Sequence, residues 1–184
     1  MAIPLDATRL DEAFRRLGDL VALTRDVDLL LVGSAAAIAT GVLPRTRTTA
    51  DCDVMIYEPA DAASAVHVAA DRVAVELGLP SDWLNTDVQI RLDALPDGWE
   101  RRKVLIAVHG RIRVWGASRP DLIAMKVLAG RPKDLDDLRA MRVRADDIAF
   151  VQRYLEALPA KGTHPEEIDS ARQILKSLTI HDHE

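Results

Sequence analysis

The amino-acid sequence predicts an α/β protein in which helices and strands alternate along one globular unit. Two patterns indicate this class. Apolar residues recur at spacings of three and four, which is typical of helices packed on one face, and short apolar runs lie between those segments. A chain of 184 residues can bury one core, and we expect residues 1–118 to form it, with residues 119–184 as a helical region packed against it.

The composition excludes several kinds of protein. Hydrophobic residues make up 48% and charged residues 29%, and no apolar run is long enough to span a bilayer, so we expect no membrane partner. The opening "MAIPLDATRLDEAF" lacks the pattern of a signal peptide, which makes the cytoplasm the expected location. The net charge of −5 argues against nonspecific coating of nucleic acid. Cys52, the only cysteine, is expected to be a buried hydrophobe rather than a nucleophile.

The first elements are a helix, a strand and a second helix. Apolar residues follow helical spacing through residues 6–23, so the first helix should begin near Asp6 or Thr8. The run "DLLLVG", residues 28–33, is typical of a strand buried on both faces. The run "SAAAIATG", residues 34–41, predicts a short helix with a polar N-cap and a C-terminal glycine. These capping residues would be Ser34 and Gly41.

A second strand is predicted in "CDVMIYE", residues 52–58. Its alternation places Asp53 and Met55 on the same face as the preceding Asp51, and the intervening apolar residues on the other face. Residues 59–78 follow as an alanine-rich helix that starts at a proline and ends at a glycine, and we expect this helix to cover the sheet.

The rest of the chain is predicted to contain two β segments and four helices. The segment "RKVLIAVHGRIRVW" should form two strands interrupted at "HG". Helices that open with Pro, Asp or Glu are expected at residues 119–130, 133–143, 145–158 and 165–178. A turn containing Pro and Gly, residues 159–167, separates the last helix from the others.

Two acids stand one residue apart at the start of the second strand. On one strand face, Asp51 and Asp53 would lie within about 7 Å of each other, where like charges repel. Mg²⁺ compensates such a pair, because this hard cation prefers carboxylate oxygens and completes its shell with water and substrate phosphates. The alternative is structural: Asp51 caps the strand, and Asp53 pairs with Arg45 or Arg47.

Upstream of these acids, Gly33 and Ser34 open a helix directly after a buried strand. A glycine there lets a phosphate approach the backbone, and free N–H groups at a helix start favour an anion. Strand-to-helix turns also use these residue types for geometry alone. The order of strand, Gly-Ser turn, helix and Asp-x-Asp strand is more specific than either feature by itself.

The segment from Leu29 to Tyr57 resembles the nucleotidyltransferase superfamily of the polymerase-beta type, which carries a Gly-Gly or Gly-Ser turn followed by an Asp-x-Asp strand. Within it, "RTTADCD" resembles the R-x-T-x-D-x-D segment of the minimal nucleotidyltransferases related to AbiEii-type toxins and to the antitoxin partners of HEPN ribonucleases. The matching residues are Arg47, Thr49, Asp51 and Asp53.

A second block, "DLIAMKVLAGRPKDLDDL", resembles the later helical motif of these families, in which an arginine and an acidic run follow a lysine. Lys126 matches the lysine, and Asp134 and Asp137 match the acids. The segment "DWLN", residues 82–85, is also similar to the subgroup. The matches together span Leu29 to Met141, and the first block is the more specific.

This resemblance implies a mixed sheet with packed helices, and transfer of a nucleoside monophosphate from an NTP to an acceptor hydroxyl. By residue match, Asp51 and Asp53 would hold Mg²⁺ on the α-phosphate, and Gly33 and Ser34 would hold the β- and γ-phosphates. Lys126 would reach the triphosphate; the alternative is a solvated lysine on an amphipathic helix.

The remaining matches have less specific roles. Asp134 would orient or deprotonate the acceptor, or else belong to a capped helix with i,i+4 charge pairs. Arg47 would contact phosphate or brace the two acids, and Thr49 belongs to the same nucleotide-binding segment. Many family members carry a third carboxylate on a later strand, but residues 102–115 contain no acid. Asp93 is the nearest candidate, if residues 89–92 form a strand.

Two functional hypotheses follow from different classes of protein. The first is an active nucleotidyltransferase of a toxin–antitoxin or defence system, with tRNA or a partner protein as acceptor. The basic segment from Arg101 to Arg113 favours an RNA acceptor, unless it is a solvated strand face. The second is an inactive binding module, such as an antitoxin, which the missing third acid favours. Modification of a cationic antibiotic is a weaker third hypothesis.

Overall fold

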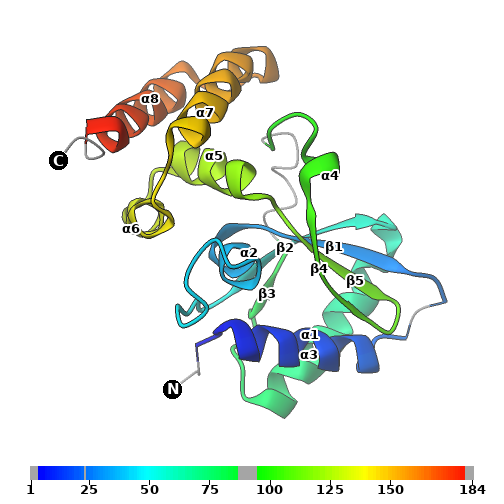
Figure 1. The fold of residues 1–184 in the computed structure, drawn as a ribbon. Helices are drawn as coiled ribbons and strands as arrows, with labels where there is room; N and C mark the ends of the chain where they lie inside the picture. The colour runs from blue at the N-terminus through cyan, green and yellow to red at the C-terminus, as the bar shows by residue number, and fades with distance from the viewer. Residues whose placement is uncertain (1–3, 23, 87–94, 181–184) are drawn as a thin grey trace.

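The computed structural model describes residues 4–22, 24–86 and 95–180. At its centre lies a five-stranded mixed sheet with the order β3-β2-β1-β5-β4 (Figure 1). The strands are β1 (Val27–Leu31), β2 (Cys52–Glu58), β3 (Leu84–Asn85), β4 (Val104–His109) and β5 (Ile112–Gly116). Helices surround this sheet, and the predicted fold class is confirmed: the protein is a mixed α/β structure with a C-terminal helical part.

Strand pairing brings the predicted turn and the two acids to one end of the sheet. β1 runs antiparallel to β2, with Leu31 opposite Val54, and the N–H of Val32 donates to the carbonyl of Asp53 at 3.0 Å. The end of β1 therefore meets the start of β2. β1 runs parallel to β5, and β3 runs parallel to β2. All five residues of β1 are buried, as expected for a central strand.

Helices α1 (Ala7–Leu20) and α3 (Ala63–Leu77) lie side by side on one face of the sheet (Figure 1). The carboxylate of Asp6 accepts from the backbone N–H groups of Thr8 and Arg9, so this predicted helix start is confirmed. Between the two helices, the ring of Phe14 meets the ring of Trp83 edge-on, with centroids 5.7 Å apart. This contact belongs to the main hydrophobic core.

The C-terminal helices stack beyond one end of the sheet (Figure 1). They are α5 (Arg119–Ala129), α6 (Pro132–Met141), α7 (Ala145–Ala157) and α8 (Pro165–Ile180), and a 3₁₀ turn, Leu158–Lys161, separates the last two. α5 packs against α6, α7 and α8 and also against α2 (Gly33–Ala39). It therefore joins the helical part to the Gly-Ser turn. The division between residues 118 and 119 stays a prediction.

Some details differ from the sequence prediction. The N-cap of α2 is Val32, with no side-chain capping bond, and its C-cap is Thr40. The predicted N-cap Ser34 therefore lies two residues inside the helix, and the predicted C-cap Gly41 lies one residue beyond the observed C-cap. β3 and the one-turn helix α4 (Trp99–Arg102) were not predicted, because two to four residues are too few to show a period. Asp93 and the strand considered for residues 89–92 lie outside the described residues.

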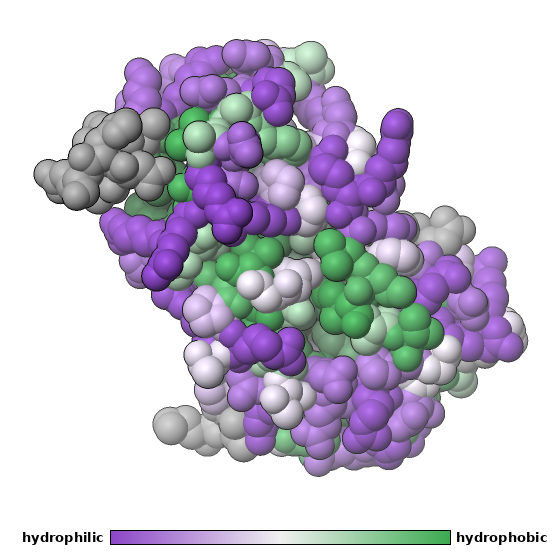
Figure 2. All heavy atoms as spheres, viewed as in Figure 1, coloured by the Kyte–Doolittle hydropathy of each residue, from purple (hydrophilic) through white to green (hydrophobic). Residues whose placement is uncertain are grey.

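Polar side chains cover most of the face seen in Figure 2, and apolar side chains gather near its middle. The edge strand β4 contributes to the exposed apolar surface, since Val104, Leu105 and Val108 are each 45% to 56% exposed. In the part of the chain that the structure describes, no helix is long and apolar enough to cross a membrane.

Candidate functional site

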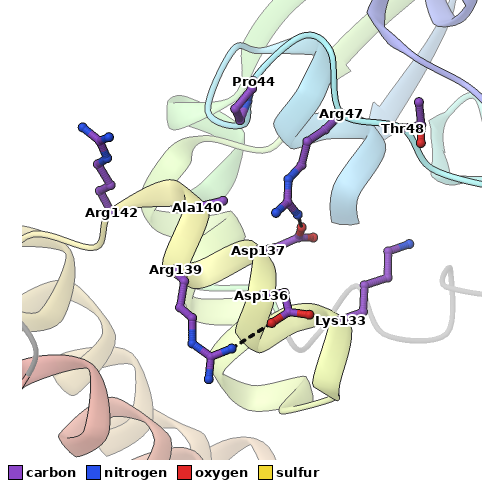
Figure 3. Close-up of a pocket in the computed structure, with 9 residues that line it drawn as sticks. All are labelled: Pro44, Arg47, Thr48, Lys133, Asp136, Asp137, Arg139, Ala140 and Arg142. Atoms are coloured by element: carbon purple, nitrogen blue, oxygen red, sulfur yellow. Dashed lines mark hydrogen bonds and ion pairs between the residues drawn. The ribbon is translucent and has the colours of Figure 1, made fainter.

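A cleft of about 600 Å³ lies where the turn between β1 and α2 faces the start of β2 and helices α5 and α6. Segments far apart in the sequence meet at this cleft. The predicted site residues that line it are Gly33, Ser34, Thr49, Asp51, Asp53, Lys126 and Asp134. Arg47 is outside this lining and points toward α6 (Figure 3).

The Gly33 backbone is held close to the Asp53 side chain. Gly33 has a φ of +65°, a left-handed conformation that residues with a Cβ rarely adopt. A Cβ at this position would lie 2.8 Å from Oδ2 of Asp53. Both the backbone angle and the close approach require glycine, so the floor of the cleft is formed by bare backbone beside a carboxylate.

Among the described residues, the hydrogen-bond partners of Asp51 and Asp53 are neutral. The Asn85 amide donates to Oδ1 of Asp53 at 2.9 Å, and the Thr49 hydroxyl lies 3.4 Å from Oδ1 of Asp51. Within the described residues, neither carboxylate has a cation at ion-pair distance. Arg47 pairs with Asp137 instead, at 2.6 Å, which argues against the structural alternative for Asp53.

The electrostatic surroundings of Asp53 oppose its charge. Burial raises the pKa of this carboxyl, and the negative charge of Asp51 raises it further. The hydrogen bond from Asn85 and the more distant charges of Arg131 and Lys133 act in the opposite direction but do not outweigh burial. A cation placed between Asp51 and Asp53 would remove this repulsion.

A second, fully paired cluster lies behind the Gly-Ser turn. The Lys126 ammonium contacts Asp137 at 2.7 Å, Asp134 at 3.1 Å and the Ser34 hydroxyl at 3.3 Å. The Ser34 hydroxyl donates to Asp137 at 2.7 Å. The Lys126, Asp134 and Asp137 side chains are each 3% exposed. The cluster ties α2, α5 and α6 together, and buried charges of this kind require such pairing.

Two arginines complete the cluster from outside. Arg47 pairs with Asp137 at 2.6 Å, and Arg131 pairs with Asp134 at 2.7 Å. Burial alone would raise the pKa of Asp137, but the hydrogen bonds from Lys126 and Ser34 and the positive charges nearby hold it below its ordinary value. Each oxygen of Asp134 accepts from a different cation.

The donor set at Asp51 and Asp53 fits Mg²⁺ bound together with a substrate. Carboxylate oxygens are its preferred protein ligands, and an NTP would supply further oxygens. The described residues contain no group of three His, Cys, Asp or Glu side chains able to hold a metal ion. A cation here would therefore have few protein ligands and would depend on phosphates and water, which is usual for Mg²⁺.

Several cleft residues were given no role from the sequence, although Asn85 belongs to the segment "DWLN" that resembled the subgroup. Asn85 pairs in register with Asp53 across the β2–β3 ladder. Arg131 and Lys133 flank the start of α6, and their charges reach Asp53. Both cations lie in the second motif block, which was a usable signal. Tyr154 and Glu167 come from α7 and α8 and carry no local pattern that marks them for the cleft.

The basic segment on β4 and β5 is largely neutralised. Arg113 binds Asp28 through two hydrogen bonds of 2.6 and 3.0 Å, and Arg111 pairs with Asp26 at 3.3 Å. Both arginines lie at the start of β5, beside the start of the parallel strand β1, whereas the cleft lies at the end of β1. This arrangement supports a paired surface more than an RNA contact.

The fold and the cleft together define the class. A mixed sheet that presents a Gly-Ser turn against an Asp-x-Asp strand is the arrangement that the resemblance to nucleotidyltransferases implies. The chain belongs to the family described as nucleotidyltransferase of unknown function (DUF6036), whose model matches residues 8–159. Comparison with curated proteins and with solved structures gives no match.

Proposed function

We propose that this protein is a Mg²⁺-dependent nucleotidyltransferase that moves a nucleoside monophosphate from an NTP to an acceptor hydroxyl. The observation that carries the proposal is the pair Asp51 and Asp53 in the cleft: neither has a cation partner among the described residues, and Asp53 lies against the bare backbone of Gly33. When bound, Mg²⁺ would supply charge neutralisation at the α-phosphate. The family description agrees with this class of reaction.

In this reaction the acceptor hydroxyl gives its proton to solvent and its oxygen bonds to the α-phosphorus, while the bond from that phosphorus to the oxygen bridging the α- and β-phosphates breaks and pyrophosphate leaves. The chain's own residues would position the triphosphate. Gly33 presents bare backbone beside Asp53 in the cleft, and Ser34 follows it at the cleft wall. Arg131 and Lys133 also line the cleft and would bring positive charge to the leaving pyrophosphate.

For Lys126 and Asp134 we propose a positioning role. Both side chains line the cleft but are almost fully buried and bound to each other. Through Ser34 and Asp137 they fix the Gly-Ser turn relative to α6. Lys126 would thus act on the triphosphate through the turn, and Asp134 would hold Arg131 toward the nucleotide. Arg47 and Thr49 would brace the two acid pairs.

The biological setting follows from the resemblance to AbiEii-type and minimal nucleotidyltransferases. We propose a toxin–antitoxin or defence system, with tRNA or a partner protein as acceptor. The second candidate is an inactive binding module of the same fold, such as an antitoxin. The described strands β4 and β5 carry no third carboxylate, and the described residues contain no group of three acidic, His or Cys side chains able to hold a metal ion, which favours that candidate.

One experiment separates these candidates. The purified protein is incubated with each labelled NTP, Mg²⁺ and total cellular RNA, and an Asp53→Asn variant serves as the control. The enzyme transfers label to RNA or to protein only in the wild type. A binding module leaves the label on the free nucleotide in both proteins. Retention of wild-type transfer by Asp53→Asn would contradict the role given to the acid pair.

A further inference from the structure

A second hollow opens beside the cleft, between the loop after α2 and helix α6 (Figure 3). We call it the α6 hollow; its volume is about 970 Å³. Four cationic side chains line it against two carboxylates: Arg47, Lys133, Arg139 and Arg142 against Asp136 and Asp137. Because Lys133 lines both spaces, the hollow and the cleft adjoin.

The two carboxylates of the hollow are already compensated. Asp137 is bound by Lys126 and Arg47, and Asp136 pairs with Arg139 at 2.7 Å. Arg139 and Asp136 are both mostly exposed, so this pair is weak. The described structure places no carboxylate at ion-pair distance from Lys133 or Arg142. The hollow therefore carries excess positive charge on a chain whose net charge is −5.

The backbone at Arg142 gives an independent indication. Arg142 ends α6 in the left-handed conformation, with a φ of +51°, and is the one non-glycine residue with positive φ in the described chain. Three other helical segments end in this conformation at Gly78, Gly130 and Gly162. Arg119 stabilises the strained turn by donating to the Arg142 carbonyl at 3.0 Å. An arginine where glycine is easier indicates that the side chain has a use.

We propose that the α6 hollow binds the phosphodiester backbone of an RNA strand whose terminal hydroxyl enters the cleft as acceptor; this inference rests on the proposed function. Lys133 and Arg142 are nine residues apart on α6, roughly 14 Å along the helix. That length exceeds the distance between successive phosphates of one strand, so the two cations can contact different phosphates. A protein acceptor would bring a hydroxyl without a row of anions, so the charge pattern favours RNA.

The test is binding of a fluorescein-labelled single-stranded RNA with a free 3′ hydroxyl, measured by anisotropy at several salt concentrations without NTP. The test variant is Arg139→Gln with Arg142→Asn, since asparagine tolerates the left-handed turn. Loss of two phosphate contacts should lower the slope of log K against log salt by about 1.4 and weaken binding about tenfold at low salt.

A matched control carries Arg172→Gln with Arg153→Gln. Arg172 forms an i,i+3 pair with Asp169 like that of Arg139 with Asp136, and neither control residue lines the hollow. The control should bind RNA like the wild type. Circular dichroism melts should show both variants folded, and calorimetry should give them unchanged Mg-NTP affinity.

Four outcomes would overturn the inference: no RNA binding by the wild type at about 50 mM salt, equal salt slopes in wild type and test variant, an equal loss in the control, or a parallel loss of Mg-NTP binding. The last would assign the hollow to the nucleotide itself. RNA binding needs no turnover. If the Arg139→Gln, Arg142→Asn variant lost RNA affinity as expected but the wild type transferred no nucleotide, the proposed function alone would be overturned.

Discussion

Two pairs of aspartates, one in the cleft and one in the cluster behind the Gly-Ser turn, have opposite surroundings. Asp134 and Asp137 are almost fully buried, and cations bind their oxygens. Asp51 and Asp53 are more accessible and have an amide and a hydroxyl as partners. The pKa of Asp137 is lowered, since hydrogen bonds outweigh burial, whereas burial and a neighbouring acid raise the pKa of Asp53.

The opposite surroundings indicate a structural role for one pair and a chemical role for the other. A buried carboxylate with two cation partners stabilises the fold only while the partners stay in place. A carboxylate held beside another acid destabilises the metal-free fold and gains a favourable partner only when a cation arrives. The pair on β2 therefore fits ligand binding, and the pair on α6 fits positioning.

The largest expected effect comes from Asp53→Asn. Asparagine keeps the size and the hydrogen bond from Asn85 but removes one carboxylate ligand, so nucleotide transfer should fall by about a thousandfold or more. Because the repulsion with Asp51 is relieved, the melting temperature without metal should equal or exceed that of the wild type. Transfer assays and thermal melts with and without Mg-NTP measure both.

Asp53 would not differ from the buried pair in role if Asp53→Asn were less stable than the wild type while Mg-NTP left the wild-type melting temperature unchanged. That result would make Asp53 a structural residue. In the expected case Mg-NTP raises the melting temperature of the wild type much more than that of the variant.

The second largest effect is expected for Lys126→Met. Methionine fills similar space but leaves Asp134 and Asp137 without their shared buried cation, so unfolding should become easier by about 3–5 kcal/mol. Urea unfolding measures the change. Lys133→Met is the matched control: Lys133 is exposed, so its loss should change stability by less than about 0.5 kcal/mol. Equal stability of the two variants would contradict a structural role for the α6 pair.

An intermediate effect is expected for Gly33→Val. The valine side chain would collide with Asp53, so Mg-NTP binding should weaken about tenfold or more. Because Gly33 has a positive φ, the substitution should also cost about 1–3 kcal/mol of stability. Gly41→Val is the control, because Gly41 has a φ of +75° but no atom within 4 Å of an added Cβ. It should lose similar stability and keep Mg-NTP affinity in calorimetry. A Gly33 variant that binds as tightly as the control would place the phosphates elsewhere.

The sequence predicted most of the fold because its longer elements have clear periods. The helix that begins after Asp6, the buried run of β1 and the acidic start of β2 all follow from local pattern. The cleft residues of the two motif blocks were predicted to act together, and they line one cleft. Only the roles remain predictions.

The sequence could not predict contacts that depend on tertiary packing. The spacing of Lys126 and Asp134 gives no sign that both are buried with Ser34, since that requires α2 to lie against α5. The positive charge of Arg111 and Arg113 was visible, but not its pairing with Asp26 and Asp28 from a neighbouring strand. The local pattern also does not predict that Arg142, which ends α6, has a positive φ.

The smallest expected effect is the pH dependence of stability in EDTA, where Asp28 serves as a compensated reference on β1. Burial opposes its charge, but hydrogen bonds from Arg113 and Trp115 hold the pKa of Asp28 below its ordinary value. Its stabilising contribution is therefore present above the unfolded pKa of about 3.9 and is lost as pH falls through the folded pKa. Asp53 has a raised pKa, so its charge lowers stability as pH rises through the folded value. At neutral pH the Asp28→Asn variant should be less stable to unfolding than the wild type, and this difference should disappear as the pH falls. The Asp53→Asn variant should become more stable than the wild type as the pH rises from about 4 toward neutral. Each change in the free energy of unfolding should stay below about 1 kcal/mol. Urea unfolding across this pH range measures the free energy of unfolding of each variant minus that of the wild type. If both differences changed with pH in the same direction, Asp53, which has no cation partner among the described residues, would not differ electrostatically from Asp28, which is paired with Arg113.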